Sequence, residues 1–133
     1  MIFVDTNILL DFLTDDPVWK PWSLAAYESS AASDRIAIND VVYAEISVRF
    51  VKMEDVETVL VRTALSVEPM RRAALFLAGK TYKAYRAAGG VRTGVLPDFV
   101  IGAHATVAQA ALLTRDPRRY RTYFPGLKLI APA

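Results

Sequence analysis

The chain of 133 residues contains no cysteine and a single histidine, His104. Without cysteine, a disulfide framework, a thiolate zinc site and a cysteine nucleophile are all excluded, and the composition suits a reducing compartment such as the cytoplasm. One histidine excludes a metal site with two histidine ligands and allows a Ser-His-Asp triad only if His104 serves it. We expect His104 to pack, or to form a hydrogen bond, within an alanine-rich helix rather than to act in catalysis.

A long hydrophobic run is also lacking. The longest stretch without a charged residue, 99–114, has sixteen residues and includes His104, Thr106 and Gln109, so it is too short and too polar to span a bilayer. Asp5 interrupts the first apolar stretch and no basic residue precedes it, so no signal peptide is predicted. With 53% hydrophobic and 23% charged residues, we expect one folded domain over 1–133, cytoplasmic and not associated with a membrane.

Charge is unevenly distributed, although the net charge is only +2. Residues 1–69 contain twelve acidic and five basic residues, whereas 70–133 contain eleven basic and only two acidic ones. A basic half is typical of proteins that bind a polyanion such as nucleic acid. Mutual neutralisation of the two halves in the folded protein explains the pattern equally well.

Short apolar runs alternate with helical patterns along the chain. The patterns predict strands over 1–4, 35–38, 66–68, 111–114 and 128–130, helices over 6–13, 19–32, 41–51, 55–64, 70–88 and 97–110, and a short helix or turn over 115–123. Such alternation indicates an α/β protein with a mainly parallel sheet covered on both faces. Ligands of these sheets bind at the carboxyl ends of the strands, beside helix N-termini.

Four carboxylates fall at or near such positions. Asp5 closes the first strand, Glu45 lies about a turn into the helix after the second, Asp98 stands in the first turn after Pro97, and Asp116 follows the fourth strand. Each acid alone is explained by helix capping or by solvation. Brought together, carboxylates about 5 Å apart repel by roughly 3 kcal/mol per pair, so they require a cation. A ligand set of oxygen atoms alone favours Mg²⁺ or Mn²⁺.

Three blocks of sequence resemble the PIN-domain ribonucleases. The blocks are IFVDTN at 2–7, LPDFVIGAHA at 96–105 and LTRD at 113–116, and Glu45 stands where this family carries its second acid. The resemblance covers the whole chain in the order of the family. A free-standing domain of this length looks most like the VapC toxins of toxin–antitoxin pairs.

The resemblance implies a three-layer α/β/α fold with a sheet of four or five strands. It also implies an Mg²⁺-dependent endoribonuclease toxin, with Mn²⁺ as a substitute, that leaves 5′-phosphate and 3′-hydroxyl ends, is neutralised by a VapB-like antitoxin and forms a homodimer. The residues that would hold the metal, directly or through water, are Asp5, Glu45, Asp98 and Asp116. Asn7 would orient the Asp5 side of the site, and Thr114 would form a hydrogen bond within it.

A basic cluster lies beside Asp116. Many members of the resembling family carry an acid three residues after the last catalytic one, where this chain has Arg119; this departure weakens the case for a second metal ion and leaves a one-metal site intact. We assign the cluster to the RNA backbone, with antitoxin contact and a solvated basic turn as the alternatives. Its members are Arg115, Arg118, Arg119 and Arg121.

Two other functions fit parts of the pattern. A catalytically silent PIN-like module that binds RNA or protein would explain the charge segregation without using the acids. A phosphohydrolase that works through an aspartyl-phosphate generally carries Asp-x-Asp after its first strand. Asn7 replaces the second acid here, so this hypothesis is the least favoured of the three functions.

Overall fold

Five short apolar strands form one parallel sheet in the computed structural model, which describes residues 1–92 and 94–133. The strands are β1 (Ile2–Val4), β2 (Ile36–Ile38), β3 (Ser66–Val67), β4 (Ala111–Leu113) and β5 (Leu129–Ile130), in the order β3-β2-β1-β4-β5. All four pairings are parallel, and Ile2 lies between Ile36 and Ala111 in the register of the central strands. Strands β1 and β2 consist of buried residues only, as expected for parallel strands covered on both faces.

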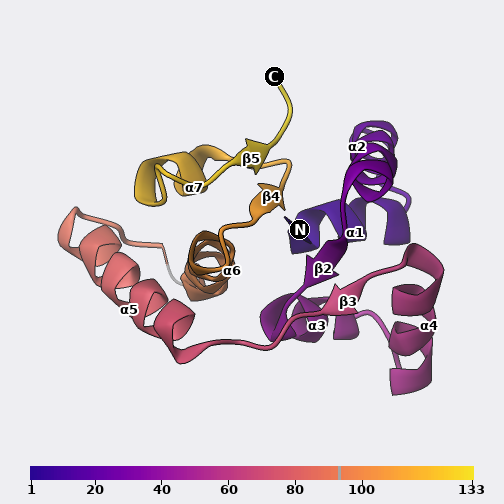
Figure 1. The fold of residues 1–133 in the computed structure, drawn as a ribbon, viewed down its shortest axis with the longest axis horizontal. Coiled ribbons are helices and arrows are strands. Elements are labelled where there is room, and N and C mark those ends of the chain that lie inside the picture. The colour runs from indigo at the N-terminus through magenta and orange to yellow at the C-terminus, as the bar shows by residue number, and fades with distance from the viewer. Residues whose placement is uncertain (93) are drawn as a thin grey trace.

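Seven helices connect and cover the strands of the described chain. They are α1 (Thr6–Leu13), α2 (Lys20–Ser33), α3 (Asp40–Ser47), α4 (Met53–Thr63), α5 (Arg72–Ala87), α6 (Leu96–Val107) and α7 (Arg118–Tyr123). The chain moves outward from β1 to β3, then returns to β4 on the other side of β1 and continues to β5. As a rule, right-handed crossovers put the helices of the outward path on one face of the sheet and those of the return path on the other. Figure 1 shows α5, α6 and α7 on one side of the row of strands and α1, α2 and α4 on the other. The predicted three-layer α/β arrangement with a parallel sheet is confirmed.

Helix boundaries differ from the predicted ones mainly around α3. Its N-terminus is capped by Asn39, whose Oδ1 accepts the backbone N–H of Val42. The helix ends at Ser47 rather than at residue 51. There the hydroxyl of Ser47 donates to the carbonyl of Tyr43, and the following amides form short turn bonds instead of helical ones. The helix therefore stops two turns after its cap, with Glu45 in its second half.

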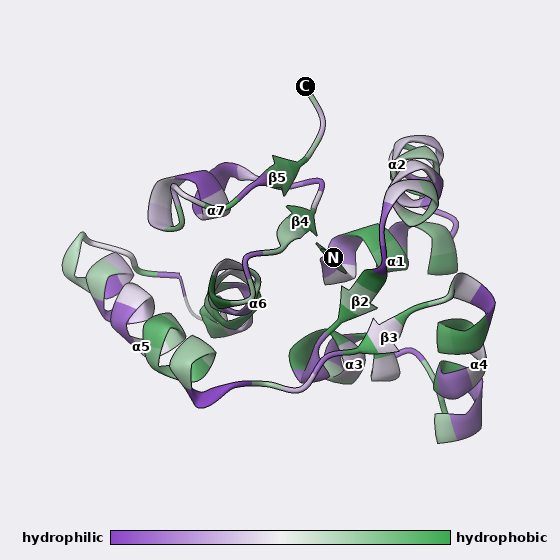
Figure 2. Cartoon of the chain, in the orientation of Figure 1, coloured by the Kyte–Doolittle hydropathy of each residue, from purple (hydrophilic) through white to green (hydrophobic). Residues whose placement is uncertain are grey.

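The core fills the space between the sheet and both helical layers. Strands β2 and β5 are hydrophobic and β3 is of intermediate hydropathy, whereas α7 is largely hydrophilic (Figure 2). Gly102 of α6 lets the ring of Phe124 approach, since a Cβ at this position would lie 2.5 Å from that ring. Close packing of this kind fixes the segment after α7 against α6. In the described residues, no helix is both long and apolar enough to cross a membrane.

Candidate active site

Asp5 occupies the centre of the carboxyl edge of the sheet. It follows β1, caps α1, and is 5% exposed. Its Oδ1 accepts the backbone N–H of Thr6 at 2.7 Å, and its Oδ2 accepts the hydroxyls of Thr114 and Tyr120, both at 2.9 Å. Asn7 Nδ2 lies 3.4 Å from Oδ2 and 3.3 Å from the hydroxyl of Thr114. The two predicted supporting residues, Asn7 and Thr114, therefore lie beside Asp5, and this carboxylate is held from several directions.

Burial dominates the electrostatics of Asp5. Loss of solvation, followed by repulsion from Asp98, raises the pKa of Asp5 from 3.8 to about 6, although the hydrogen bonds from Thr114, Tyr120 and Thr6 oppose the shift. The pKa of Tyr120 is raised well above its ordinary value by burial and by the charge of Asp5. Its phenol therefore stays protonated and acts as a donor to Asp5.

Glu45 and Asp98 face the same region from two different helices. Glu45 Oε1 accepts the hydroxyl of Thr6 at 2.7 Å, and burial and then the charge of Asp98 raise the pKa of Glu45 despite this bond. Burial also raises the pKa of Asp98, even though Arg119 donates to its Oδ2 at 2.5 Å. Thr6 thus joins Asp5, through its amide, to Glu45, through its hydroxyl.

Asp116 lies at the rim of this acidic site. Its side chain is 59% exposed, and its backbone N–H donates to the hydroxyl of Thr114 at 3.1 Å. The charge of Asp116 contributes to the raised pKa of Asp98. The four predicted acids therefore share one edge of the sheet, with Asp5 buried, Glu45 and Asp98 half-buried, and Asp116 at the surface.

The donor set fits a hydrated magnesium ion better than a closed cage of protein ligands. No group of three or more acidic or histidine side chains in the described chain is arranged closely enough to hold a metal by itself. Mg²⁺ usually keeps several waters and takes one or two carboxylates together with substrate phosphates. Among the described hydrogen bonds, Glu45 Oε2 and Asp98 Oδ1 accept none. These two oxygens are available to such an ion, whose charge would relieve the mutual repulsion of the acids.

The four arginines of the basic cluster have different surroundings. Arg115 Nε donates to both oxygens of Asp11, at 2.9 and 3.1 Å, and its guanidinium lies 5.5 Å from the ring centroid of Trp19. Arg119 pairs with Asp98, whereas Arg118 is 90% exposed and 3.7 Å from Asp116. Arg121 is exposed on α7. Only part of the predicted RNA-binding cluster is therefore free on the surface, because the partly exposed Arg115 is paired with the buried Asp11 and Arg119 is paired with Asp98.

Three polar residues of this region were missed by the sequence prediction. Thr6 bridges two acids, Tyr120 donates to Asp5, and the buried Asp11 holds Arg115 and accepts the hydroxyl of Ser23 at 2.5 Å. Each has a partner far away in the sequence: Tyr120 is 115 positions from Asp5, Thr6 is 39 from Glu45, and Asp11 is 104 from Arg115.

His104 is buried, as predicted. Its Nδ1 lies 3.3 Å from the side-chain amide of Asn39, and its ring lies 4.5 Å from that of Phe3. These contacts belong to the core, so the structure gives His104 a packing role.

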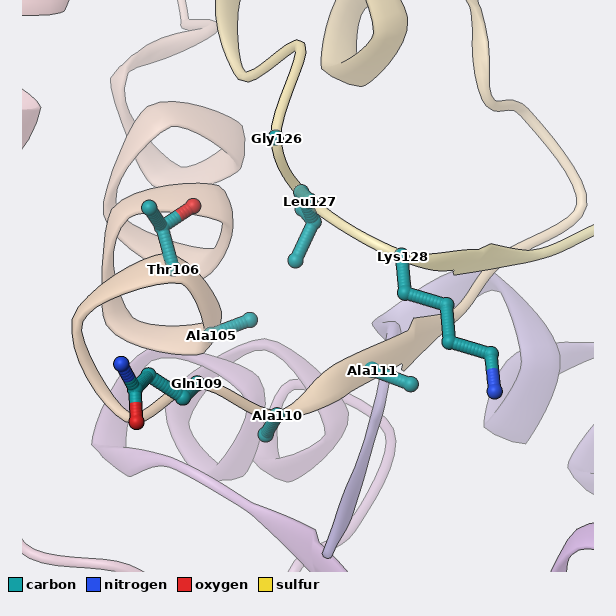
Figure 3. A pocket seen from close by; sticks show the side chains of 8 residues that line it. All are labelled: Ala105, Thr106, Gln109, Ala110, Ala111, Gly126, Leu127 and Lys128. Atoms are coloured by element: carbon teal, nitrogen blue, oxygen red, sulfur yellow. The ribbon is translucent and has the colours of Figure 1, made fainter.

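Two cavities of about 400 Å³ flank the sheet. One lies between the end of α6, the start of β4 and residues 126–128, and Lys128 is its only charged lining residue (Figure 3). The other adjoins the acids, and its lining residues are Arg92, Asp116, Arg118, Arg119, Thr122 and Tyr123. Of these two cavities, only the second is lined by predicted site residues.

The raised pKa of Asp5 predicts how stability changes with pH. Asp5 stays protonated in the folded protein up to about pH 6. Its carboxyl therefore makes its full contribution to the free energy of unfolding below pH 3.8, and this contribution is lost as the pH rises through 6. Asp5→Asn is therefore expected to stabilise the metal-free protein at pH 7, by at most about 3 kcal/mol, and by nothing near pH 4.

Urea unfolding of both proteins at several pH values, in the presence of a chelator, measures this difference. Glu28→Gln, on the exposed face of α2, serves as the control and should show no such trend. A stability difference between Asp5→Asn and the wild type that is constant between pH 4 and 7 would contradict the assigned cause.

The chain resembles known proteins in its sequence pattern and in its fold. A family model described as PIN domain matches residues 2–125. None of the curated proteins matches the chain significantly.

Solved structures with the same fold include several toxin–antitoxin complexes. VapBC2 from Rickettsia felis, bound to a DNA fragment from its promoter, is 22% identical with a TM-score of 0.69, and 100% of each chain is covered. A toxin–antitoxin complex from Klebsiella pneumoniae is 19% identical with a TM-score of 0.72, covering 100% of this chain and 98% of the other. VapBC-1 from nontypeable Haemophilus influenzae is also 19% identical with a TM-score of 0.72, and 98% of each chain is covered. At these identities, the likeness establishes the fold.

Proposed function

The chain belongs to the PIN domain family, and on that premise we propose that it is an Mg²⁺-dependent endoribonuclease, the toxin of a VapC-like toxin–antitoxin pair. One observation carries the proposal. Asp5, Glu45 and Asp98 come from three separate elements, and the charge of Asp98 raises the pKa of both other acids. A fold that gathers mutually repelling carboxylates at the carboxyl edge of a parallel sheet is suited to bind a divalent cation there.

The proposed reaction is hydrolysis of an RNA phosphodiester. The oxygen of water forms a bond to phosphorus as the bond from phosphorus to the 3′ oxygen breaks. The 3′ oxygen gains one hydrogen from the water, which leaves a 3′-hydroxyl on the upstream fragment, and the downstream fragment keeps the phosphate on its 5′ oxygen. Mg²⁺ held by Asp98, Glu45, Asp5 and Asp116, directly or through water, would polarise a phosphate oxygen and lower the pKa of the attacking water.

The protein's own residues hold the acids in place for this reaction. Thr114 and Tyr120 donate to Asp5 Oδ2, and Thr6 donates to both Asp5 and Glu45. Hydrogen bonds to a carboxylate that binds a metal hold this carboxylate in the required orientation. Loss of such hydrogen bonds typically lowers metal affinity or activity about 10- to 100-fold. Asp5 is thereby the acid of the site with the most hydrogen bonds, and Asp116 at the rim is the most exposed to solvent.

An antitoxin partner is part of the proposal. The solved structures of the same fold include VapBC complexes from three genera, so we propose a VapB-like antitoxin for this chain as well. We further propose that the chain acts in the cytoplasm as a single domain and as a homodimer.

A divalent metal ion is expected to be required for RNA cleavage and to stabilise the folded protein. Purified protein should cut single-stranded RNA in Mg²⁺ or Mn²⁺ and not in EDTA, and the products should carry 5′-phosphate and 3′-hydroxyl ends. Mg²⁺ at a hundredfold excess over its dissociation constant should add about 2.7 kcal/mol to the free energy of unfolding. Gel analysis of end-labelled RNA and calorimetric melting measure the two effects.

RNA that binds and remains intact in both metals would contradict the nuclease proposal. It would favour the silent binding module that the charge segregation also allows. Loss of the bound RNA as salt is increased would then be steep, because phosphate contacts release counterions.

A further inference from the structure

Arg119 differs from the other arginines of its cluster. Its Nη1 donates to Asp98 Oδ2 at 2.5 Å, its guanidinium lies 6.0 Å from the ring centroid of Tyr85, and its side chain is 21% exposed. Arg118 is 90% exposed, and Arg115 is bound to Asp11. Arg119 is therefore the member of this cluster that is both held in a defined place and in contact with one of the acids.

Most of the hydrogen-bonding capacity of Arg119 is unused. A guanidinium has five N–H donors in a planar fork, and the hydrogen bonds of the described residues engage Arg119 only through Nη1. The neighbouring residue Tyr120 binds Asp5. Arg119 and the buried acid are thus positioned by the same short helix, α7, which fixes the cation relative to the acidic site.

The cavity beside these donors is suited to an anion. Arg119 lines the space of about 400 Å³ together with Arg92 and Arg118, and Asp116 is the one acid in its lining. Three cations against one carboxylate make the cavity electropositive, directly beside an acidic metal site. An anion that contacts both this cavity and the acids would have its negative charge between the arginines and the proposed metal ligands.

We propose that Arg119 is a catalytic residue that binds the non-bridging oxygens of the phosphate being cleaved. The inference rests on the proposed nuclease function and names the group that Arg119 contacts within it. In the transition state, negative charge is spread over these oxygens while the bond from water to phosphorus forms and the bond to the 3′ oxygen breaks. A fixed guanidinium donor stabilises that charge more than it stabilises the ground state, because it is already oriented.

Kinetics of Arg119→Gln test the assignment. With RNA as substrate in Mg²⁺, kcat should fall about 100-fold, the effect of removing one donor to a developing oxyanion, and KM should change less than about threefold. Arg119→Lys should recover only part of the loss, since a lysine keeps the charge and lacks the planar fork. Mg²⁺ affinity, measured by calorimetry without RNA, should not decrease in Arg119→Gln. The melting temperature shows that the variant is folded at the assay temperature.

Matched variants separate this role from a general loss of positive charge. Arg118→Gln, on the same helix, should raise KM and leave kcat nearly unchanged, and Lys128→Gln, at the opposite cavity, should leave both unchanged. Equal kcat for Arg119→Gln and the wild type would overturn the inference, as would a kcat loss accompanied by weaker Mg²⁺ binding or full recovery in Arg119→Lys. A wild-type protein that leaves RNA intact would instead contradict the proposed function itself.

Discussion

Replacing Asp98 by Asn is expected to lower RNA cleavage by at least about 100-fold, because even residues that only orient a metal ligand are worth up to about that factor. Asp98 is the acid whose charge reaches both Asp5 and Glu45, and one of its oxygens is free of hydrogen bonds from the described residues. An amide in its place keeps the shape of the side chain and removes the negative charge that a divalent ion requires. Initial rates on end-labelled RNA measure the loss.

Unfolding measurements show whether such a loss comes from the site or from the fold. Asp98→Asn and Asp5→Asn should both melt no lower than the wild type without metal, since burial already disfavours the charged form of each acid. Both should also lose the stabilisation by Mg²⁺. Wild-type rates of cleavage by both variants, with nuclease contamination excluded by a parallel mock purification, would overturn the assigned site.

Arg115→Met is expected to destabilise the protein by about 3 kcal/mol, the lower end of the range for breaking a buried ion pair, since Arg115 itself is partly exposed. The Asp11 side chain is 2% exposed and would lose both of its contacts with Arg115. The hydroxyl of Ser23 would be its remaining side-chain donor among the described residues. Urea unfolding at pH 7 measures the difference.

A double variant tests whether the unpaired carboxylate of Asp11 causes this destabilisation. Asp11→Asn combined with Arg115→Met should recover most of the loss, because replacing both partners of a buried pair is often close to neutral. Arg118→Met removes an exposed arginine with a 3.7 Å pair to Asp116 and should cost less than about 0.5 kcal/mol. Equal destabilisation by Arg115→Met and Arg118→Met would mean that the pair with Asp11 contributes nothing.

The same ion pair explains why the arginine cluster could be predicted only in part. In the sequence, Arg115, Arg118, Arg119 and Arg121 form one basic segment around Asp116, and nothing local distinguishes them. Asp11 lies 104 positions from Arg115 and Asp98 lies 21 positions from Arg119. Which arginine remains exposed depends on how the loop after β4 packs against α1 and how α7 packs against α6.

Helix ends were likewise predicted where the signal is local. The cap at Asn39 follows from its side chain and the next three residues, so the start of α3 was predicted correctly. The early end at Ser47 depends on a hydroxyl that turns back onto the chain, and the apolar pattern through residue 51 gave no sign of it.

The sequence alone is enough to predict the parallel sheet, the alternation of strands and helices, and the position of Asp5, Glu45, Asp98 and Asp116 at one edge. These features depend on apolar periodicity and on the position of each acid relative to the end of its own element, which neighbouring residues fix. Only the tertiary structure decided that Thr114 and Tyr120 hold Asp5, that Thr6 joins it to Glu45, and that Arg119 rather than Arg115 stands beside Asp98. Hydrogen bonds and ion pairs of this kind form between residues far apart in the chain, so their partners are set by the packing of whole elements.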